Sequence, residues 1–132
     1  MNAPITAAQI EALRRYGTCA VANAIETFNI RLRNEGYTDM SVRCLVPRAE
    51  PMLGFAVTMR MKSGNPPTGK SQYLDRTDWW NLLEKSPAPR IVVIEDADET
   101  PGRGSLFGEM HSRIWTALGC VGAVTNGAVR DV

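Results

Sequence analysis

The sequence predicts an α/β fold, a layered sandwich in which helices flank a central sheet. Residues 54–62, GFAVTMRMK, alternate apolar and polar side chains, as a half-buried strand does. Residues 90–96, RIVVIED, form the continuous apolar run of a buried strand. The segments before, between and after these runs carry apolar residues at helical spacing. Strands that alternate with helices are typical of α/β proteins. The length of 132 residues suits one domain, predicted over residues 1–132.

Two helices are predicted before the first strand. In the first, Thr6 is the expected cap, Gln9 stands at the capping-box position, and Ile10 and Leu13 recur at helical spacing. Gly17 is expected to end this helix, because glycine favours the residue after a helix.

The second helix is predicted over residues 19–32, with Thr18 as its cap. Its apolar residues follow the i, i+4, i+7 rule, at Val21, Ile25, Phe28 and Leu32. Residues 33–40 are expected to form a loop, and residues 42–46 a short strand that ends before Pro47.

The second half of the chain alternates predicted helices and strands. Residues 71–85 predict a helix after the first strand, and residues 96–105 predict a polar loop after the second. A helix over residues 106–119, closed by Gly119, precedes the last strand at residues 120–127. The inner side of the helix over residues 71–85 is expected to carry Leu74, Trp79, Leu82 and Leu83.

Composition excludes several classes of protein. Fifteen basic and fourteen acidic residues give a net charge of +1, without the basic surface of a nucleic-acid-binding protein. No apolar run reaches the roughly 20 residues that cross a membrane, and the N-terminus lacks the apolar core of a signal peptide. Cys19, Cys44 and Cys120 are widely spaced, which is typical of reduced, buried thiols. A soluble, cytoplasmic protein with no nucleic-acid or membrane partner is expected.

Residues 63–71, SGNPPTGKS, match the phosphate-binding loop pattern G-x-x-x-x-G-K-[ST] through Gly64, Gly69, Lys70 and Ser71. Such a loop works by pointing successive backbone N–H groups at phosphate oxygens. Pro67 removes one of these donors and fixes the backbone there. A surface loop rich in proline and glycine is therefore favoured, and an ATP-binding protein is the disfavoured alternative.

In the C-terminal stretch FGEMHSRIWTALGCVGAVTNGAVRDV, twenty residues separate Glu109 from the pair Arg130–Asp131. Together with TCAVANAI, PMLGFAVTMR and APRIVVIED, in this order, it resembles one family across the whole chain. This is the family of 4-hydroxy-4-methyl-2-oxoglutarate aldolases, which includes the regulator of ribonuclease E activity A (RraA). The resemblance implies an RraA-like fold, similar to the phosphohistidine swivelling domain, and assembly as a homotrimer or hexamer.

The resemblance also implies a site that joins the two ends of this stretch. The turn whose backbone N–H groups would hold the carboxylate of pyruvate comprises Gly108, Glu109, Met110 and His111. The same turn opens a predicted helix, and a helix N-terminus attracts anions. Arg130 would polarise the substrate carbonyl, and Asp131 would bind Mg²⁺ or Mn²⁺.

The implied activity is that of a class II aldolase, a metal-dependent carbon–carbon lyase that cleaves 4-hydroxy-2-oxo acids to pyruvate. Decarboxylation of oxaloacetate, which also passes through pyruvate enolate, could occur at the same site. The cation and Arg130 would stabilise the enolate, and Glu109 would order or deprotonate a water molecule.

Other interpretations stay open. The chain could be a non-catalytic regulator of ribonuclease activity that binds protein partners. Arg130 and Asp131 could form an ordinary surface ion pair, and Glu109 could simply favour the start of a helix. His111 is expected on the helix surface, supplying only its backbone N–H group.

The sequence departs from the family pattern at three places. Asn23 stands where many relatives have aspartate, and Glu109 replaces the aspartate of the best-known aldolases. Residues of the family's C-terminal section are expected beyond Val132, where this sequence ends. For a second carboxylate on the substrate, the spacing does not choose among Arg60, Lys62, Lys70 and Arg76.

Overall fold

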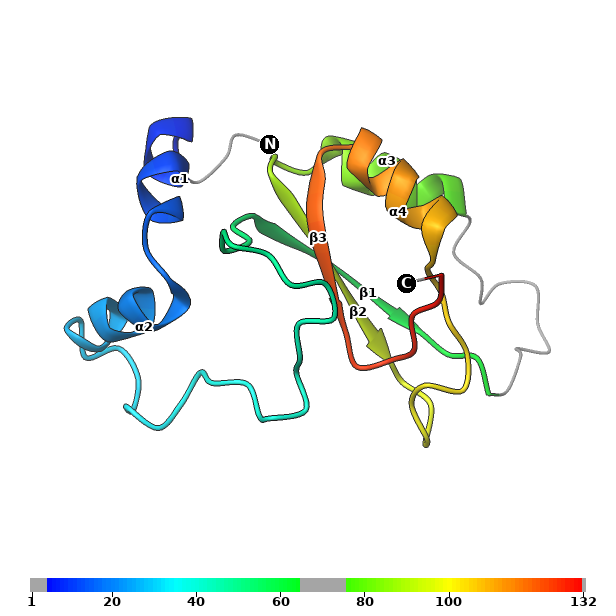
Figure 1. Cartoon of the computed structure of the whole chain (residues 1–132), viewed down its shortest axis with the longest axis horizontal. Coiled ribbons are helices and arrows are strands. Elements are labelled where there is room, and N and C mark those ends of the chain that lie inside the picture. Colours follow the sequence, from blue (N-terminus) through cyan, green and yellow to red (C-terminus); the bar gives the residue numbers. More distant parts are fainter. Residues whose placement is uncertain (1–4, 65–75, 132) are drawn as a thin grey trace. The chain divides into compact units, whose positions relative to one another are not determined.

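The computed structural model describes residues 5–64 and 76–131, which fall into two compact units, residues 5–52 and residues 53 onward (Figure 1). The first unit contains two helices, and the second contains the sheet and two further helices. The elements, in chain order, are α1 Ala7–Arg14, α2 Thr18–Glu26, β1 Phe55–Met61, α3 Arg76–Lys85, β2 Arg90–Asp96, α4 Glu109–Ala117 and β3 Cys120–Thr125.

The start of α1 is as predicted. The Thr6 hydroxyl oxygen accepts a hydrogen bond from the Gln9 backbone N–H at 3.3 Å, and the Gln9 side chain accepts one from the Thr6 N–H at 2.7 Å. This reciprocal pair is a capping box. The predicted cap of the next helix is wrong by one residue, because Gly17 is the N-cap of α2 and Thr18 is its first helical residue.

Helix α2 is shorter than predicted and ends at Glu26 rather than near residue 32. The Thr27 hydroxyl donates to the Ala24 carbonyl at 2.7 Å, and Asn29 adopts a φ of 52°. Asparagine tolerates this left-handed conformation better than most residues, and a right-handed helix cannot continue through it. Phe28 and Leu32, whose spacing suggested a longer helix, are exposed.

The predicted strand at residues 42–46 is wrong. These residues have no strand assignment in the structure, and Leu45 and Val46 are exposed. A strand requires a neighbouring strand to satisfy its backbone N–H and C=O groups, and local sequence does not reveal whether that neighbour exists.

The three remaining strand predictions are confirmed. β1, β2 and β3 form a parallel sheet in the order β1-β2-β3, with Val57 opposite Val92 and Ile94 opposite Thr125. Strand β2 lies in the centre, which explains its continuous apolar run. The predicted α/β class is therefore confirmed.

Helices α3 and α4 pack on one face of this sheet (Figure 1). The opposite face presents an ion pair between Arg60 and Glu95, with a nitrogen–oxygen distance of 2.7 Å. Arg60 is thus engaged on the face away from α3 and α4. The buried core between the helices and the sheet consists of Val57, Trp79, Leu83, Val92, Ile94, Trp115 and Cys120.

Helix α3 separates two leucines that were both expected on its inner side. Leu83 is 0 % exposed, whereas Leu82 is 45 % exposed. Trp79 is buried as predicted, and Leu74 lies outside the described residues.

We expect Leu83→Ala to lower the free energy of unfolding by about 2–5 kcal/mol, because the substitution leaves a cavity in the core. The matched variant Leu82→Ala should change it by less than about 1 kcal/mol, since Leu82 is partly solvated. Urea unfolding followed by tryptophan fluorescence measures both values. Equal losses in the two variants would contradict the packing of α3.

The three cysteines are free, as predicted, but only Cys120 is buried. Cys19 and Cys44 are exposed, so the expectation that each fills a buried position is wrong for these two. Among the helices that the structure describes, none has the length and apolar character needed to cross a membrane.

Candidate functional site

The predicted site residues lie beyond the carboxyl ends of β2 and β3. In open parallel sheets this edge is where ligands usually bind. The segment before α4 and the segment after β3 run side by side, through a parallel bridge between Ser105 and Ala128. The Arg130 N–H then donates to the Phe107 carbonyl at 3.3 Å. These contacts bring the start of α4 next to the pair Arg130–Asp131.

Asp131 meets the N-terminus of α4 directly. Its Oδ2 accepts a hydrogen bond from the Glu109 N–H at 3.3 Å and lies 3.7 Å from Arg130 Nε. Asp131 has a φ of 60°, in the left-handed region that a non-glycine residue adopts infrequently. Four predicted site residues are therefore adjacent in the structure: Gly108, Glu109, Arg130 and Asp131.

Gly108 is the N-cap of α4, and its missing side chain permits this approach. A Cβ at Gly108 would overlap Asp131 Oδ2, and it would lie 2.8 Å from Arg130 Cγ and 3.0 Å from Asp131 Cγ. Its φ of −149° lies outside the left-handed region that favours glycine, so the need for glycine here is one of space.

Met110 and His111, the other two residues of the predicted turn, point to different environments. Met110 is 52 % exposed, whereas His111 is only 5 % exposed. The His111 ring packs against Trp115 with a centroid distance of 5.7 Å. The expectation of a surface histidine is wrong, because positions i and i+4 of a helix share one face and Trp115 is in the core.

The Glu109 carboxylate faces along the helix rather than toward Asp131. Its Oε1 accepts hydrogen bonds from Arg113 at 2.9 Å and 2.6 Å. Both side chains are largely exposed, so the pair contributes about 0–1 kcal/mol to stability. This contact agrees with the interpretation of Glu109 as a helix-surface residue, and its role in proton transfer stays a prediction.

The described part of the site offers a cation one open carboxylate oxygen. Among residues 5–64 and 76–131 no three His, Cys, Asp or Glu residues gather as a metal-binding group. In the same part of the chain, Asp131 Oδ1 has no hydrogen-bond partner, so one carboxylate oxygen is open. Mg²⁺ commonly binds through one or two carboxylates and keeps several waters, which matches this arrangement better than a tetrahedral zinc site.

Two further polar residues at this edge carry no family motif of their own. Asp96, at the end of β2, is 2 % exposed and accepts hydrogen bonds from Asp98 N–H at 3.1 Å and Gly102 N–H at 2.7 Å. The Asn126 side chain accepts from Asp96 N–H at 2.7 Å and donates to Asp96 C=O at 3.0 Å. An aspartate that ends a buried strand and an Asn-Gly turn after the next strand were the available sequence signals.

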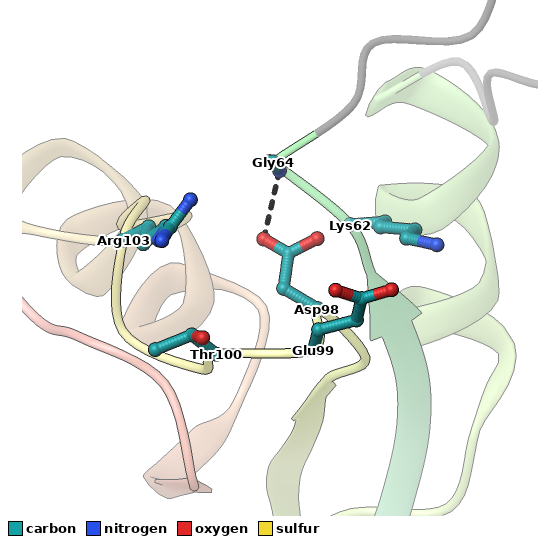
Figure 2. Close-up of a pocket in the computed structure, with 6 residues that line it drawn as sticks. All are labelled: Lys62, Gly64, Asp98, Glu99, Thr100 and Arg103. Atoms are coloured by element: carbon teal, nitrogen blue, oxygen red, sulfur yellow. Dashed lines mark hydrogen bonds between the residues drawn. The ribbon is translucent and has the colours of Figure 1, made fainter.

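The Asp98 carboxylate binds the backbone N–H groups at the start of residues 63–71, the segment that carries the phosphate-loop pattern. It accepts hydrogen bonds from Ser63 Oγ at 2.6 Å, Ser63 N–H at 3.0 Å and Gly64 N–H at 2.8 Å. Figure 2 shows this carboxylate turned toward Gly64. A hollow of about 90 Å³ lies beside it. The hollow is lined by Lys62, Gly64, Asp98, Glu99, Thr100 and Arg103.

This arrangement disfavours the ATP-binding interpretation. Two donors at the start of the loop already bind a carboxylate, and that negative charge would repel a phosphate. The rest of the pattern, Gly69, Lys70 and Ser71, lies outside the described residues, as does Pro67.

The Asp98 contacts predict a pH-dependent stability. Hydrogen bonds from the Ser63 hydroxyl and the Gly64 amide hold the pKa of Asp98 below its usual value. A carboxyl group with a lowered folded-state pKa stabilises the fold above its unfolded pKa, about 3.9, and this stabilisation is lost as the pH falls through the folded pKa. Asp98→Asn should therefore lower the melting temperature at pH 7, by an amount that shrinks toward pH 3.

Thermal unfolding of both proteins between pH 3 and pH 7 measures this difference. The neighbouring Glu99→Gln is the matched control, since Glu99 is exposed, and its melting temperature should follow that of the wild type. A difference between wild type and Asp98→Asn that stays constant with pH would contradict the role of Asp98.

A family model described as RraA-like, Aldolase/RraA, matches residues 18–132. The match includes the sheet, α3, α4 and both segments of the candidate site, and it confirms the family resemblance seen in the sequence. Comparisons with curated proteins and with solved structures gave no match.

Proposed function

The chain belongs to the Aldolase/RraA family, and on this basis we propose that it is a divalent-metal-dependent lyase that releases pyruvate from 4-hydroxy-2-oxo acids. The observation that carries the proposal is the contact between Asp131 and the N-terminus of α4, with Arg130 beside it. A helix N-terminus, a carboxylate with an open oxygen and a guanidinium lie close together there, and this supports the proposal.

The first proposed step is binding of the substrate's carboxylate at the start of α4. The free N–H groups of a helix N-terminus favour a negative charge. Asp131 Oδ2 already accepts the Glu109 N–H, so the substrate must displace this contact. Displacement leaves both Asp131 oxygens available, and in this way binding of the 2-oxo acid favours binding of a cation.

Arg130 supplies a charge beside the substrate carbonyl. Its side chain is 63 % exposed and its Nε lies 3.7 Å from Asp131, so the guanidinium can turn toward a ligand held at Glu109 N–H. A positive charge placed where the carbonyl oxygen becomes negative lowers the barrier.

Cleavage then proceeds as a retro-aldol reaction. The 4-hydroxyl loses its proton, the bond between C3 and C4 breaks, C4 leaves as a carbonyl compound, and the electron pair of the broken bond forms pyruvate enolate. Protonation of C3, by water or by the proton acceptor, then gives pyruvate. Mg²⁺ or Mn²⁺ held by Asp131 would supply Lewis-acid stabilisation of the enolate. Glu109 is the proposed proton acceptor, acting directly or through water, and must leave Arg113 to do so. Oxaloacetate decarboxylation requires the same stabilisation and is a proposed second activity.

The proposal extends to the organisation of the protein. Residues 1–132 are proposed to act as one RraA-like domain in a cytoplasmic homotrimer or hexamer. One feature supports a reducing location, and a second supports an assembly. The thiols of all three cysteines are free, and several large apolar side chains of the first unit are exposed, including Phe28, Ile30, Leu32, Met40, Leu45 and Val46.

Pyruvate release from 4-hydroxy-4-methyl-2-oxoglutarate and from oxaloacetate tests the proposal. We expect release with Mg²⁺ or Mn²⁺, and its loss on addition of EDTA and recovery with excess Mg²⁺. If the folded protein with saturating Mg²⁺ turned over neither substrate, the enzyme proposal would fail, and the non-catalytic regulator would be the better interpretation.

A further inference from the structure

The Asn126 side chain extends the pairing of β2 and β3 by one more rung. Backbone pairing of these strands ends at Ile94 and Thr125. At the next position the Asn126 Oδ1 accepts from Asp96 N–H at 2.7 Å, and its Nδ2 donates to Asp96 C=O at 3.0 Å. A side-chain amide carries both a donor and an acceptor, so it replaces a peptide group here.

The turn after β3 is packed closely against Asp96. The Gly127 N–H donates to Thr125 Oγ1 at 2.9 Å, and a Cβ at Gly127 would lie 3.0 Å from Asp96 Cβ. The Asp96 carboxylate in turn holds Asp98 and Gly102, in the loop that leads to α4. Asp96 therefore connects the loop after β2 with the turn after β3.

Both connected segments end at the candidate site. From Asn126 the chain runs through the bridge between Ala128 and Ser105 to Arg130, whose N–H donates to Phe107. Asp131 follows. The position of Asp131 relative to α4 thus depends on where the turn at Asn126 begins.

We propose that Asn126 is a positioning residue, which sets Arg130 and Asp131 against the start of α4 through its two hydrogen bonds to the Asp96 backbone. This inference rests on the proposed function only for its effect on metal and substrate. Its structural part concerns the segments themselves and is measured without turnover.

The structural test is amide hydrogen exchange by NMR. In Asn126→Ala, protection of the Arg130 N–H should fall at least about tenfold. The Phe55 N–H, which donates to Pro89 C=O at 2.8 Å across the sheet, should keep its protection. Leu83→Ala is the control for general destabilisation, and it should lower the protection of both amides together. Unchanged protection at Arg130, or equal losses at Arg130 and Phe55 in Asn126→Ala, would overturn the inference.

The functional test uses Asn126→Asp, which keeps the side-chain shape but replaces the donor with an acceptor facing the Asp96 carbonyl. We expect the Mn²⁺ dissociation constant and the KM for the 2-oxo acid to rise about tenfold, the range for a residue that orients a metal ligand, with a smaller change in kcat. Asn81→Asp, on an exposed position of α3, is the matched control and should leave both constants unchanged.

The outcomes separate the two proposals. Wild-type protein without Mn²⁺ binding or turnover would refute the proposed function, while the exchange measurement would still decide the role of Asn126. Active wild type with unchanged constants in Asn126→Asp would refute the positioning role and leave the proposed function standing.

Discussion

Asp131→Asn should lower pyruvate release at least about a hundredfold, the scale expected when charge stabilisation at a reacting centre is lost. The amide oxygen of asparagine can still accept the Glu109 N–H, so the contact that places residue 131 is retained. Only the negative charge is removed, and with it the main attraction for a divalent cation. The measurement is kcat/KM for both substrates over a range of Mg²⁺ concentrations.

The matched control is Asp78→Asn, which makes the same change of charge at an exposed position in the first turn of α3. Its kcat/KM should equal that of the wild type. An Asp131→Asn enzyme that kept both its rate and its Mg²⁺ dependence would show that the cation binds elsewhere.

Gly108→Ala should lower kcat/KM for the 2-oxo acid at least about a hundredfold. The added methyl group would overlap Asp131 Oδ2 and crowd Arg130 Cγ at 2.8 Å. The φ of Gly108, −149°, lies outside the left-handed region that favours glycine, so the expected effect arises from the contact with Asp131 and Arg130. Initial rates, with circular dichroism to confirm the fold, measure this variant.

Gly17→Ala is the control, because Gly17 is also a helix N-cap but has no atom within 4 Å of an added Cβ. It should retain activity. A fully active Gly108→Ala enzyme would contradict the close approach of Asp131 to α4.

Local sequence predicted the sheet well because burial leaves a direct pattern. Phe55, Val57, Met59 and Met61 alternate on β1, and the central position of β2 explains its unbroken apolar run. The length of helix α2 was predicted wrongly because the prediction relied on apolar spacing alone. Its apolar spacing continues to Leu32, but the backbone conformation of Asn29 ends the helix, and spacing carries no information about that.

The candidate site was predictable in part. The family resemblance identified Gly108, Glu109, Arg130 and Asp131, and the structure places them together. The burial of His111 could have been inferred from Trp115, four residues later on the same helix face. Asp96 and Asn126 were missed because a strand-end aspartate and an Asn-Gly turn do not reveal which backbone atoms the side chains bind, in the case of Asn126 thirty residues away.

Calorimetric titration with oxalate, a stable analogue of pyruvate enolate, tests the central claim most directly. If Asp131 holds a cation beside the anion site of α4, oxalate should bind the wild type at least about tenfold more tightly with Mg²⁺ than with EDTA. Asp131→Asn should remove this dependence on Mg²⁺. Oxalate affinity that is the same with Mg²⁺ and with EDTA in the wild type would contradict the claim.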